Sequence, residues 1–360
     1  LGSKQGDNSQ ILALAEALGL PYRPIPLHFN PLRLLLPALL GRSLWSVRNR
    51  QQLRGPGPRL VISSGLRSVA AARWVQQQQQ RRGEPCQLVH LGRPWGPPTW
   101  FDLIVTTPQY ALSAGPNVRH NLLPLLADAR PQPAPGPALS RQLAALPRPW
   151  TIVLLGGHSR PLRFTADAAR TLAATLNSRS GSVLVLGSPR TPAACIEALA
   201  PALTVPHLLL PFGGHPEGNP YPALRALADD FVVTRDSVQM AAELLVCGKP
   251  LQVFALPERP DVLVRLTRAW RDLAARWSVF RPAFDWMRHR GLLSSLRDVA
   301  LFHQQLDAAG AYRDPDLARQ LRTAEKTVTV HRIQQLLRNQ AATASAAPAG
   351  HAPRSALRQP

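Results

Sequence analysis

Cysteine and long apolar runs are both scarce in this sequence. Of 360 residues only three are cysteine, and Cys86, Cys195 and Cys247 show neither the CxxC spacing of a redox motif nor that of a zinc site. We therefore expect no disulfide framework and a reducing compartment. The longest apolar stretch, residues 31–41, contains Arg33 and two prolines. It is shorter than the roughly 20 residues of a membrane-spanning helix.

Nucleic-acid binding has no motif to support it, although 42 Lys+Arg against 21 Asp+Glu give a net charge of +21. Only three of these basic residues are lysines, and an arginine bias together with 37 prolines is also typical of a GC-rich genome. Aromatic residues make up 6% and never alternate with basic residues in a recognition motif. A nucleic-acid partner is not expected.

Acidic residues are absent from one long segment, residues 17–83, which contains eleven arginines. Residues 1–130 hold 15 basic and 5 acidic residues, a net +10, whereas residues 151–277 hold 13 and 10, a net +3. The acid-free segment also contains a leucine cluster between Leu32 and Val47. This combination favours a basic amphipathic surface that meets an anionic membrane. A pair of core helices with solvated arginines would produce the same pattern.

Short runs of Val, Ile and Leu alternate with segments of helical period, which predicts parallel α/β units. With 45% hydrophobic residues, the chain has enough apolar side chains for two domains. The expected fold class is two Rossmann-like, doubly wound parallel-sheet domains. Strands are expected at 60–63, 88–91, 103–106, 152–155, 183–186, 207–210, 231–234 and 251–255.

Proline marks the expected domain boundary. Residues 131–149 contain six prolines and are predicted to be a linker. Residues 1–130 form the expected N-terminal domain, whose first strand is expected to be missing because a helix at 9–18 begins almost at Leu1. No signal peptide is expected, since no charged and then apolar leader is present. The remaining expectations are a C-terminal nucleotide-binding domain at 150–277, helices crossing back to the N-terminal domain at 278–338, and a disordered tail at 339–360.

Five turns rich in Gly and Ser follow predicted strands or begin predicted helices, the position where α/β proteins hold phosphates. Neither GxGxxG nor GxxxxGK[ST] occurs. The turns still indicate a nucleotide crevice between two domains. The candidate nucleotide-binding residues are Gly156, Gly157, Ser188, Arg190, Thr191, Asp236, Ser237 and Glu243, and the candidate residues of the facing cleft are Gly6, Gln10, Ser64, Gly65 and Arg67.

The pattern from Phe231 to Pro250 is the most specific of these: strand, polar turn, helix, carboxylate, turn and strand. Ser237 is expected to cap the helix, and Glu243, two turns later, can accept hydrogen bonds from the paired hydroxyls of a ribose. The spacing of Glu243, Gly248 and Pro250 resembles the glutamate–glycine–proline element of GT-B glycosyltransferases. A helix cap followed by a surface glutamate is the alternative interpretation.

A series of blocks spread over most of the chain resembles the mitochondrial-fission "elongated mitochondria" family. Where plant-like members are expected to carry Ser-Val-Ser-Met, this chain has Gln239 in place of the second serine. The blocks are Gly6-Asp7-Asn8-Ser9-Gln10, Ser63-Ser64-Gly65-Leu66-Arg67, residues 101–108, Gly156-Gly157, Ser188-Pro189-Arg190-Thr191-Pro192, Asn219-Pro220-Tyr221, and residues 234–250.

The resemblance implies a GT-B-like arrangement and two different roles. Bacterial members, which the arginine-rich composition favours, resemble glycosyltransferases. This implies a nucleotide-diphosphate sugar as donor, no permanently bound cofactor, and an envelope or lipid-linked acceptor. Plant members imply a non-catalytic adaptor, with a dynamin-related protein as partner only if that role applies. The expected location is cytoplasmic and peripheral on the inner membrane.

An inverting transfer needs a base on the N-terminal domain to deprotonate the acceptor hydroxyl. Asp7, in the first loop, is the preferred candidate, and His90, at a strand end, is the second. Arg190 and Arg160 can neutralise the leaving diphosphate. Asp314-Pro315-Asp316 has the D-x-D spelling but lies in a turn before a helix, so it is interpreted as a cap and no metal is expected.

Overall fold

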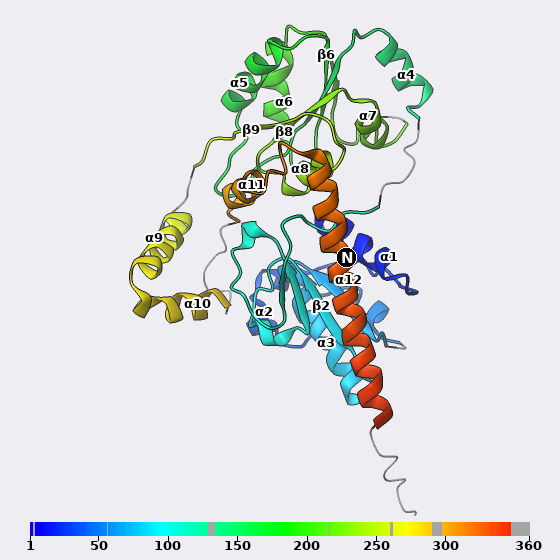
Figure 1. The fold of residues 1–360 in the computed structure, drawn as a ribbon, viewed down its shortest axis with the longest axis vertical. Coiled ribbons are helices and arrows are strands. Elements are labelled where there is room, and N and C mark those ends of the chain that lie inside the picture. The colour runs from blue at the N-terminus through cyan, green and yellow to red at the C-terminus, as the bar shows by residue number, and fades with distance from the viewer. Residues whose placement is uncertain are drawn as a thin grey trace, which may run out of the picture.

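Two separate parallel sheets organise the chain (Figure 1). The computed structural model describes residues 1–2, 4–55, 57–128, 134–215, 217–259, 262–289 and 297–346. The front sheet has the strand order β1-β2-β3-β4 and the back sheet β7-β6-β5-β8-β9, with every neighbouring pair parallel. The predicted class of two Rossmann-like parallel α/β domains is confirmed.

All eight predicted strands form, within about two residues of their expected ends. One further strand, Val118–His120, was not predicted. It has only three residues, and because two of them are Arg119 and His120, it lacks the apolar run that identifies a buried strand. The strands are β1 Leu60–Ser64, β2 Gln87–Leu91, β3 Leu103–Thr106, β4 Val118–His120, β5 Trp150–Leu154, β6 Ser182–Leu186, β7 His207–Leu210, β8 Asp230–Thr234 and β9 Leu251–Phe254.

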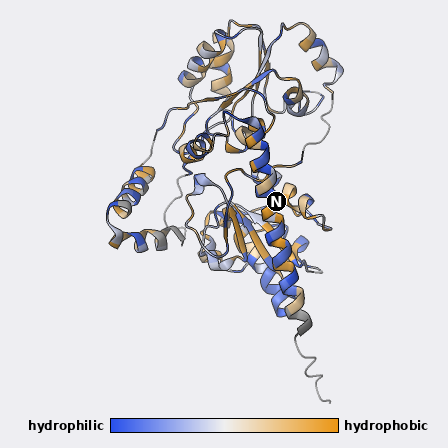
Figure 2. Cartoon of the chain, viewed as in Figure 1, coloured by the Kyte–Doolittle hydropathy of each residue, from blue (hydrophilic) through white to orange (hydrophobic). Residues whose placement is uncertain are grey.

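Helices cover the sheets, whose central strands are hydrophobic (Figure 2). The α-helices are α1 Gln5–Leu18, α2 Pro37–Leu40, α3 Val69–Arg81, α4 Pro137–Ala144, α5 Ala166–Asn177, α6 Ala193–Leu199, α7 Tyr221–Leu227, α8 Val238–Leu245, α9 Val262–Arg276, α10 Arg281–His289, α11 Val299–Ala308 and α12 Pro315–Ala346. The 3-10 helices are η1 Pro31–Leu34, η2 Arg50–Leu53, η3 Leu66–Ser68, η4 Pro98–Trp100, η5 Pro108–Tyr110, η6 Ala200–Ala202 and η7 Ser278–Phe280.

The front sheet buries its two faces against helices from both ends of the chain. On one face, Leu14 of α1 and Ile333 of α12 pack against β2 and β3, and both are fully buried. On the other face, Val69 of α3 packs against Leu88 and Ile104. A helix that begins more than 190 residues after the last front strand therefore completes the front core.

Strand β1 lies at the edge of the front sheet. An open cavity of about 1430 Å³ runs beside it, between residues 59–64 and the segment 20–27. Leu12, Ala15 and Val75 contribute to its mainly apolar lining.

The proline-rich segment is not wholly a linker. Residues 129–133 lie outside the described part, but residues 137–144 form α4, whose Leu139 and Leu143 are buried against Trp150 and Ile152 of the back sheet. Pro137 occupies the first turn of α4, where a missing N–H costs nothing. The prediction of a linker throughout 131–149 is therefore wrong at 137–144, because proline stops a helix interior but suits a helix start.

Helix α12 crosses from the back domain to the front domain (Figure 1). Its first turns contribute Ala318 and Leu321 to the back core, and its later turns contribute Ile333 to the front core. Helix α12, in the segment 278–338 that was expected to cross back, thus contributes to both cores. Helix α11 also bridges, because Phe302 is buried in the back core while the Asp298 N–H donates to the Gln109 carbonyl of η5, at 2.8 Å.

Two further predicted boundaries need correction. The back sheet ends at Phe254, and α9, which was assigned to the domain 150–277, lies apart from that sheet in Figure 1. The tail predicted to be disordered from 339 is helical as far as Ala346, and residues 347–360 lie outside the described part. Among the described residues, no helix is both long and apolar enough to cross a bilayer.

Candidate functional site

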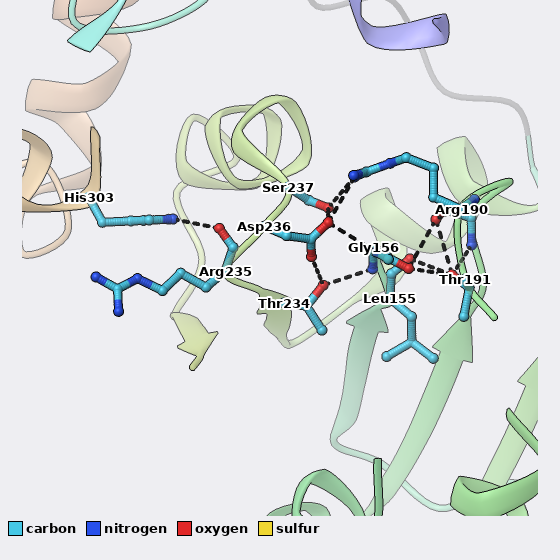
Figure 3. Close-up of polar contacts among 11 residues, drawn as sticks. Leu155, Gly156, Arg190, Thr191, Thr234, Arg235, Asp236, Ser237 and His303 are labelled. Carbon is cyan, nitrogen blue, oxygen red and sulfur yellow. Dashed lines mark hydrogen bonds and ion pairs between the residues drawn. The ribbon is translucent and has the colours of Figure 1, made fainter. Parts of the chain in front are cut away.

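The back sheet brings three loops together at the carboxyl ends of β5, β6 and β8. Strand β5 is central, with β6 on one side and β8 on the other, so the chain order reverses beside it. In open α/β sheets this reversal creates a crevice where ligands bind. The loops after these strands carry seven of the eight predicted nucleotide-binding residues, and Figure 3 shows polar contacts among them.

Asp236 is the centre of this loop cluster. Its side chain is buried, and its carboxylate accepts hydrogen bonds from the Gly157 N–H at 3.0 Å, the Thr234 hydroxyl at 2.8 Å and the Ser237 hydroxyl at 3.2 Å. Arg190 Nη2 lies 3.0 Å from Asp236 Oδ2, which completes an ion pair. Asp236 was predicted to contact the nucleotide, but its side chain is used inside the protein, so we correct its role to positioning the loops.

Gly156 and Gly157 are required by close packing. A Cβ on Gly156 would lie 2.2 Å from Asp236 Oδ1, and one on Gly157 would lie 2.0 Å from the Arg190 carbonyl oxygen. The Gly156 N–H donates to the Thr234 hydroxyl at 2.7 Å, and the Gly157 N–H donates to Asp236. Both N–H groups thus have a buried acceptor in this structure, and the role of the two glycines in nucleotide binding stays a prediction.

Ser188, Arg190 and Thr191 fold one loop against another. The Thr191 hydroxyl donates to the carbonyls of Leu155 and Gly156, at 2.9 and 2.7 Å, and the Ser188 N–H donates to the Thr191 oxygen at 2.8 Å. Arg190 reaches across to the Ser237 hydroxyl at 2.9 Å, while 44% of its side chain stays exposed. Arg190 is thus held at the crevice and remains accessible to a ligand.

Ser237 does not cap α8 through its side chain. Although it occupies the N-cap position, its hydroxyl donates to Asp236 and accepts from Arg190 instead of bonding the helix N–H groups. The predicted cap is therefore wrong. The charged neighbours compete for the hydroxyl, and a charge-assisted hydrogen bond is stronger than a neutral one.

Glu243 lies two turns into α8 with both carboxylate oxygens engaged. The Tyr221 hydroxyl donates to Oε2 at 2.9 Å, and the Gln239 amide donates to Oε1 at 3.0 Å. Burial, with a smaller contribution from the Glu243 charge, raises the pKa of Tyr221 well above its usual value, so its hydroxyl stays a donor. Each carboxylate oxygen can accept a second hydrogen bond.

The front domain meets this helix through the start of α1. A Cβ on Gly6 would lie 3.4 Å from Gln239 Cβ, so the start of α1 lies within van der Waals reach of α8. Asp7, the next residue, approaches Gly65, where a Cβ would lie 3.4 Å from Asp7 Oδ2. Gly65 also has a φ of +77°, which favours glycine. Gly6, Asp7 and Gly65 therefore converge beside α8.

His90 does not face the cleft. It is fully buried, with Nδ1 2.9 Å from the Ser63 hydroxyl and Nε2 3.0 Å from the Arg93 carbonyl. Burial lowers the pKa of His90 to about 4, so the ring is neutral near pH 7. We correct its assignment as a base. Both ring nitrogens already have hydrogen-bond partners, and the hydroxyl of an acceptor substrate cannot reach a fully buried ring.

Three further candidates belong to the front domain, and one, Arg160, belongs to the back domain. The Ser64 hydroxyl donates to the Leu91 carbonyl at 3.0 Å, so it ties β1 to β2. Gln10 is half-buried on α1, one turn after Gly6, and Arg67 is half-buried in η3 directly after Gly65. Arg160 is exposed, in the loop that follows Gly157. Their roles stay predictions.

Sequence reasoning assigned no role to Thr234, Tyr221 or Gln239. Thr234 and Tyr221 were present in the quoted turns and blocks, and Gln239 marked a departure from the family pattern. The sequence did not show that both Tyr221 and Gln239 contact Glu243. Tyr221 comes from a different helix, α7, and Gln239 reaches Glu243 because residues four apart share a helix face. Among the described residues, no group of three His, Cys, Asp or Glu side chains could hold a metal ion.

Comparisons with solved structures find weak likenesses. MurG of Acinetobacter baumannii is 14% identical, with a TM-score of 0.40 and 91% and 98% of the two chains covered. Staphylococcus aureus MnaA, in a UDP co-structure, is 7% identical, with a TM-score of 0.43 and 86% and 95% covered. None of these TM-scores reaches 0.5, so the assignment of the chain rests on its sequence and its own two sheets.

The sequence comparisons are more specific. The Mitochondrial fission protein ELM1 of Arabidopsis thaliana is 25% identical over 278 residues, which is 64% of this chain and 62% of that protein. The alignment thus spans less than two thirds of the curated relative. The family model described as "Mitochondrial fission ELM1" matches residues 5–292, most of the chain. The chain therefore belongs to the Mitochondrial fission ELM1 family.

Proposed function

We propose that this protein binds a nucleotide-diphosphate sugar between its two domains and transfers the sugar, without a metal, to an envelope or lipid-linked acceptor. The observation that carries the proposal is the approach of α1 to α8, where Gly6 of the front domain lies beside Gln239, the partner of Glu243. Arg190 bonds to Ser237 at the start of the same helix, and Asp7 follows Gly6.

Glu243 is the proposed ribose partner. Tyr221 and Gln239 take one acceptor position on each of its oxygens, which leaves one further position on each for the two vicinal hydroxyls of a ribose. The buried Tyr221 hydroxyl fixes the carboxylate before the ligand arrives. Such preorganisation reduces the entropy lost on binding.

Arg190 is the proposed diphosphate partner. Its contacts to Ser237 and Asp236 both use Nη2. Among the described residues this leaves the Nε and Nη1 side of the guanidinium to bond phosphate oxygens, a geometry that arginine favours. As the bond between the sugar and the diphosphate breaks, this cation stabilises the negative charge that develops on the leaving group.

Asp7 is the proposed base. It accepts the proton of the acceptor hydroxyl while the oxygen of that hydroxyl bonds to the anomeric carbon and the nucleoside diphosphate leaves. Asp7 lies in the first turn of α1, at the end of the front domain that approaches α8.

Donor binding is tested by the thermal shift of the purified protein with UDP, GDP, CDP and ADP sugars. One nucleotide is expected to raise the melting temperature. Glu243→Ala should weaken that binding at least about tenfold, because two ribose hydrogen bonds to a charged acceptor are lost. The matched control is Glu197→Ala, an exposed glutamate of α6 in the same domain, which should bind as the wild type does.

The second candidate is a non-catalytic adaptor, which the family match favours. It predicts that no nucleotide sugar shifts the melting temperature and that Glu243→Ala changes nothing but stability. A dynamin-related protein is the proposed partner in that case. Binding of a nucleotide without any transfer would identify a pseudoenzyme and also remove the glycosyl-transfer proposal.

Peripheral association with an anionic membrane is also proposed, from the segment 31–47. Leu40, Leu44 and Val47 are buried, as the core interpretation predicted, but five apolar side chains of the same segment are exposed. These are Leu32, Leu34, Leu35, Leu39 and Trp45. Replacing Arg42, Arg48 and Arg50 by Ser should reduce flotation with anionic vesicles and leave neutral vesicles unaffected.

A further inference from the structure

Helices α9 and α10 carry apolar side chains that are exposed in the described part of the chain. Val262, Leu266, Trp270, Leu273 and Trp277 are all exposed. Their spacing of four, four, three and four residues places them within about 80° of one another on a helix. A surface helix normally turns such a stripe toward the core. Here the stripe faces solvent.

The opposite side of α9 attaches the helix to the body. Val264 is buried, Arg268 makes an ion pair with Glu258 at 2.8 Å, and Arg271 makes one with Asp298 at 3.3 Å. At 100° per residue these three positions lie roughly opposite the stripe. The polar side therefore fixes the orientation of α9 and keeps its apolar side outward.

Helix α10 continues the apolar surface. Phe280, in η7 before it, contacts Trp270 edge to face, with ring centroids 6.5 Å apart. Trp286 of α10 is 53% exposed, and Trp277 between the helices is 61% exposed. Figure 1 shows both helices projecting beside the front domain, and Figure 2 shows hydrophobic and hydrophilic residues side by side on them. We call Val262, Leu266, Trp270, Leu273, Trp277 and Trp286 the α9–α10 face.

Basic residues surround this face. Arg265 and Arg276 border the stripe on α9, and Arg281 begins α10. Residues 262–289 contain six arginines and two aspartates, a net charge of +4. Tryptophan and leucine on one side of a helix with arginine beside them are typical of helices that lie in the headgroup region of a bilayer.

We infer that the α9–α10 face docks on an anionic lipid bilayer, with its tryptophans among the headgroups and its bordering arginines against lipid phosphates. A second copy of the chain fits this face less well, because pairing two such segments would bring like charges together. The inference rests on the proposed membrane association and deepens it, since it names a second contact besides the segment 31–47.

Cosedimentation with vesicles tests the inference. The full chain is mixed with vesicles of phosphatidylcholine alone or of phosphatidylcholine with phosphatidylglycerol. Trp277→Ser with Trp286→Ser should weaken binding to the anionic vesicles by about a hundredfold, because each buried aromatic side chain contributes on the order of a tenfold gain. Phe212→Ser, at a 57% exposed position of the back domain, is the matched control and should bind normally.

Charge and insertion are tested separately. Arg265, Arg276 and Arg281 replaced together by Ser should reduce anionic-vesicle affinity roughly a hundredfold, at about a fivefold loss per arginine. Bromolipid quenching of tryptophan fluorescence in the wild type should fall in the Trp277→Ser, Trp286→Ser variant. Circular dichroism and nucleotide binding of all variants should match the wild type, which excludes misfolding as the cause.

Three outcomes would overturn the inference. Unchanged vesicle binding by the tryptophan variant, while the Arg42, Arg48, Arg50 variant loses it, would leave the front segment as the membrane contact and remove this one. A dimer of the wild type that the tryptophan variant abolishes in the absence of lipid would assign the face to a second copy. Wild-type protein that binds neither kind of vesicle would remove both membrane proposals, with nucleotide binding still tested on its own.

Discussion

The loops at the carboxyl ends of the two sheets use their polar groups in opposite ways. In the back domain, Asp236 and Arg190 bind across from β8 to β6, so the loops hold one another. In the front domain, Ser63 and Ser64 bond to the neighbouring strand β2, so they stabilise the sheet instead. The contact of the front domain with the cleft then comes from α1. Rigid support and cleft chemistry therefore reside on different elements.

Asp7→Ala should have the largest effect on activity and almost none on folding. If Asp7 is the base, the transfer rate should fall by about 10²- to 10⁴-fold while donor affinity stays unchanged. Glu16→Ala, a second acid of α1, is the control and should react normally. Turnover measured at saturating donor tests whether Asp7 is the base. An unchanged rate would mean that Asp7 only stabilises the start of α1.

Asp236→Ala should have the opposite profile. It removes the acceptor of the buried Gly157 N–H and of the Thr234 and Ser237 hydroxyls, so several buried donors lose their partner. We expect the free energy of unfolding to fall by about 3 kcal/mol, as measured by chemical denaturation. A loss below about 0.5 kcal/mol would show that the loops are not held by this carboxylate.

Acid should destabilise the front domain through His90. Its pKa is about 4 in the folded protein and 6.5 in an unfolded chain, so the unfolded state binds the proton more tightly. Stability from this group is complete above pH 6.5 and is lost as the pH falls toward 4. At pH 5 the loss is about 2 kcal/mol. In His90→Asn, denaturation at several pH values should lack this component, whereas an unchanged slope would contradict the buried neutral ring.

Arg170→Ala should have the smallest effect on the free energy of unfolding. Arg170 pairs with Asp167 three residues earlier on α5, at 2.7 Å, and both side chains are exposed. Such a pair contributes about 0.3 kcal/mol. Denaturation should therefore be unchanged within error, and a loss as large as that of Asp236→Ala would mean that the effect of Asp236 is not specific to the loop cluster.

The sequence was sufficient for the sheets because buried parallel strands are continuous apolar runs, as at Val183–Leu186. It also placed the three back-domain loops at one sheet edge, since parallel strands end together. The sequence could not show that Asp236 is buried. An aspartate that follows a strand gives the same sequence pattern whether its side chain binds a ligand or bonds to neighbouring loops. The prediction that His90 is a base was wrong for the same reason. The partners Ser63 and Arg93 come together only when β1 and β2 pair.

The predicted domain boundaries were wrong where the composition fits two structures equally well. Proline at 137 begins α4 as readily as it would extend a linker. The α9–α10 face could not be predicted as exposed either, because a periodic apolar stripe alone does not say whether a core exists to receive it. The buried Val264 and the ion pairs of Arg268 and Arg271 show which side of α9 faces the body.

Helix α12 has a consequence for the order in which the molecule is made. The last strand of the front sheet ends at His120, but Val330, Ile333, Leu336 and Leu337 supply part of the core beneath that sheet. During synthesis from the N-terminus, the front domain must wait with an uncovered apolar face while the whole back domain emerges and folds. Of the two domains, the one translated first is therefore the one whose core is completed last.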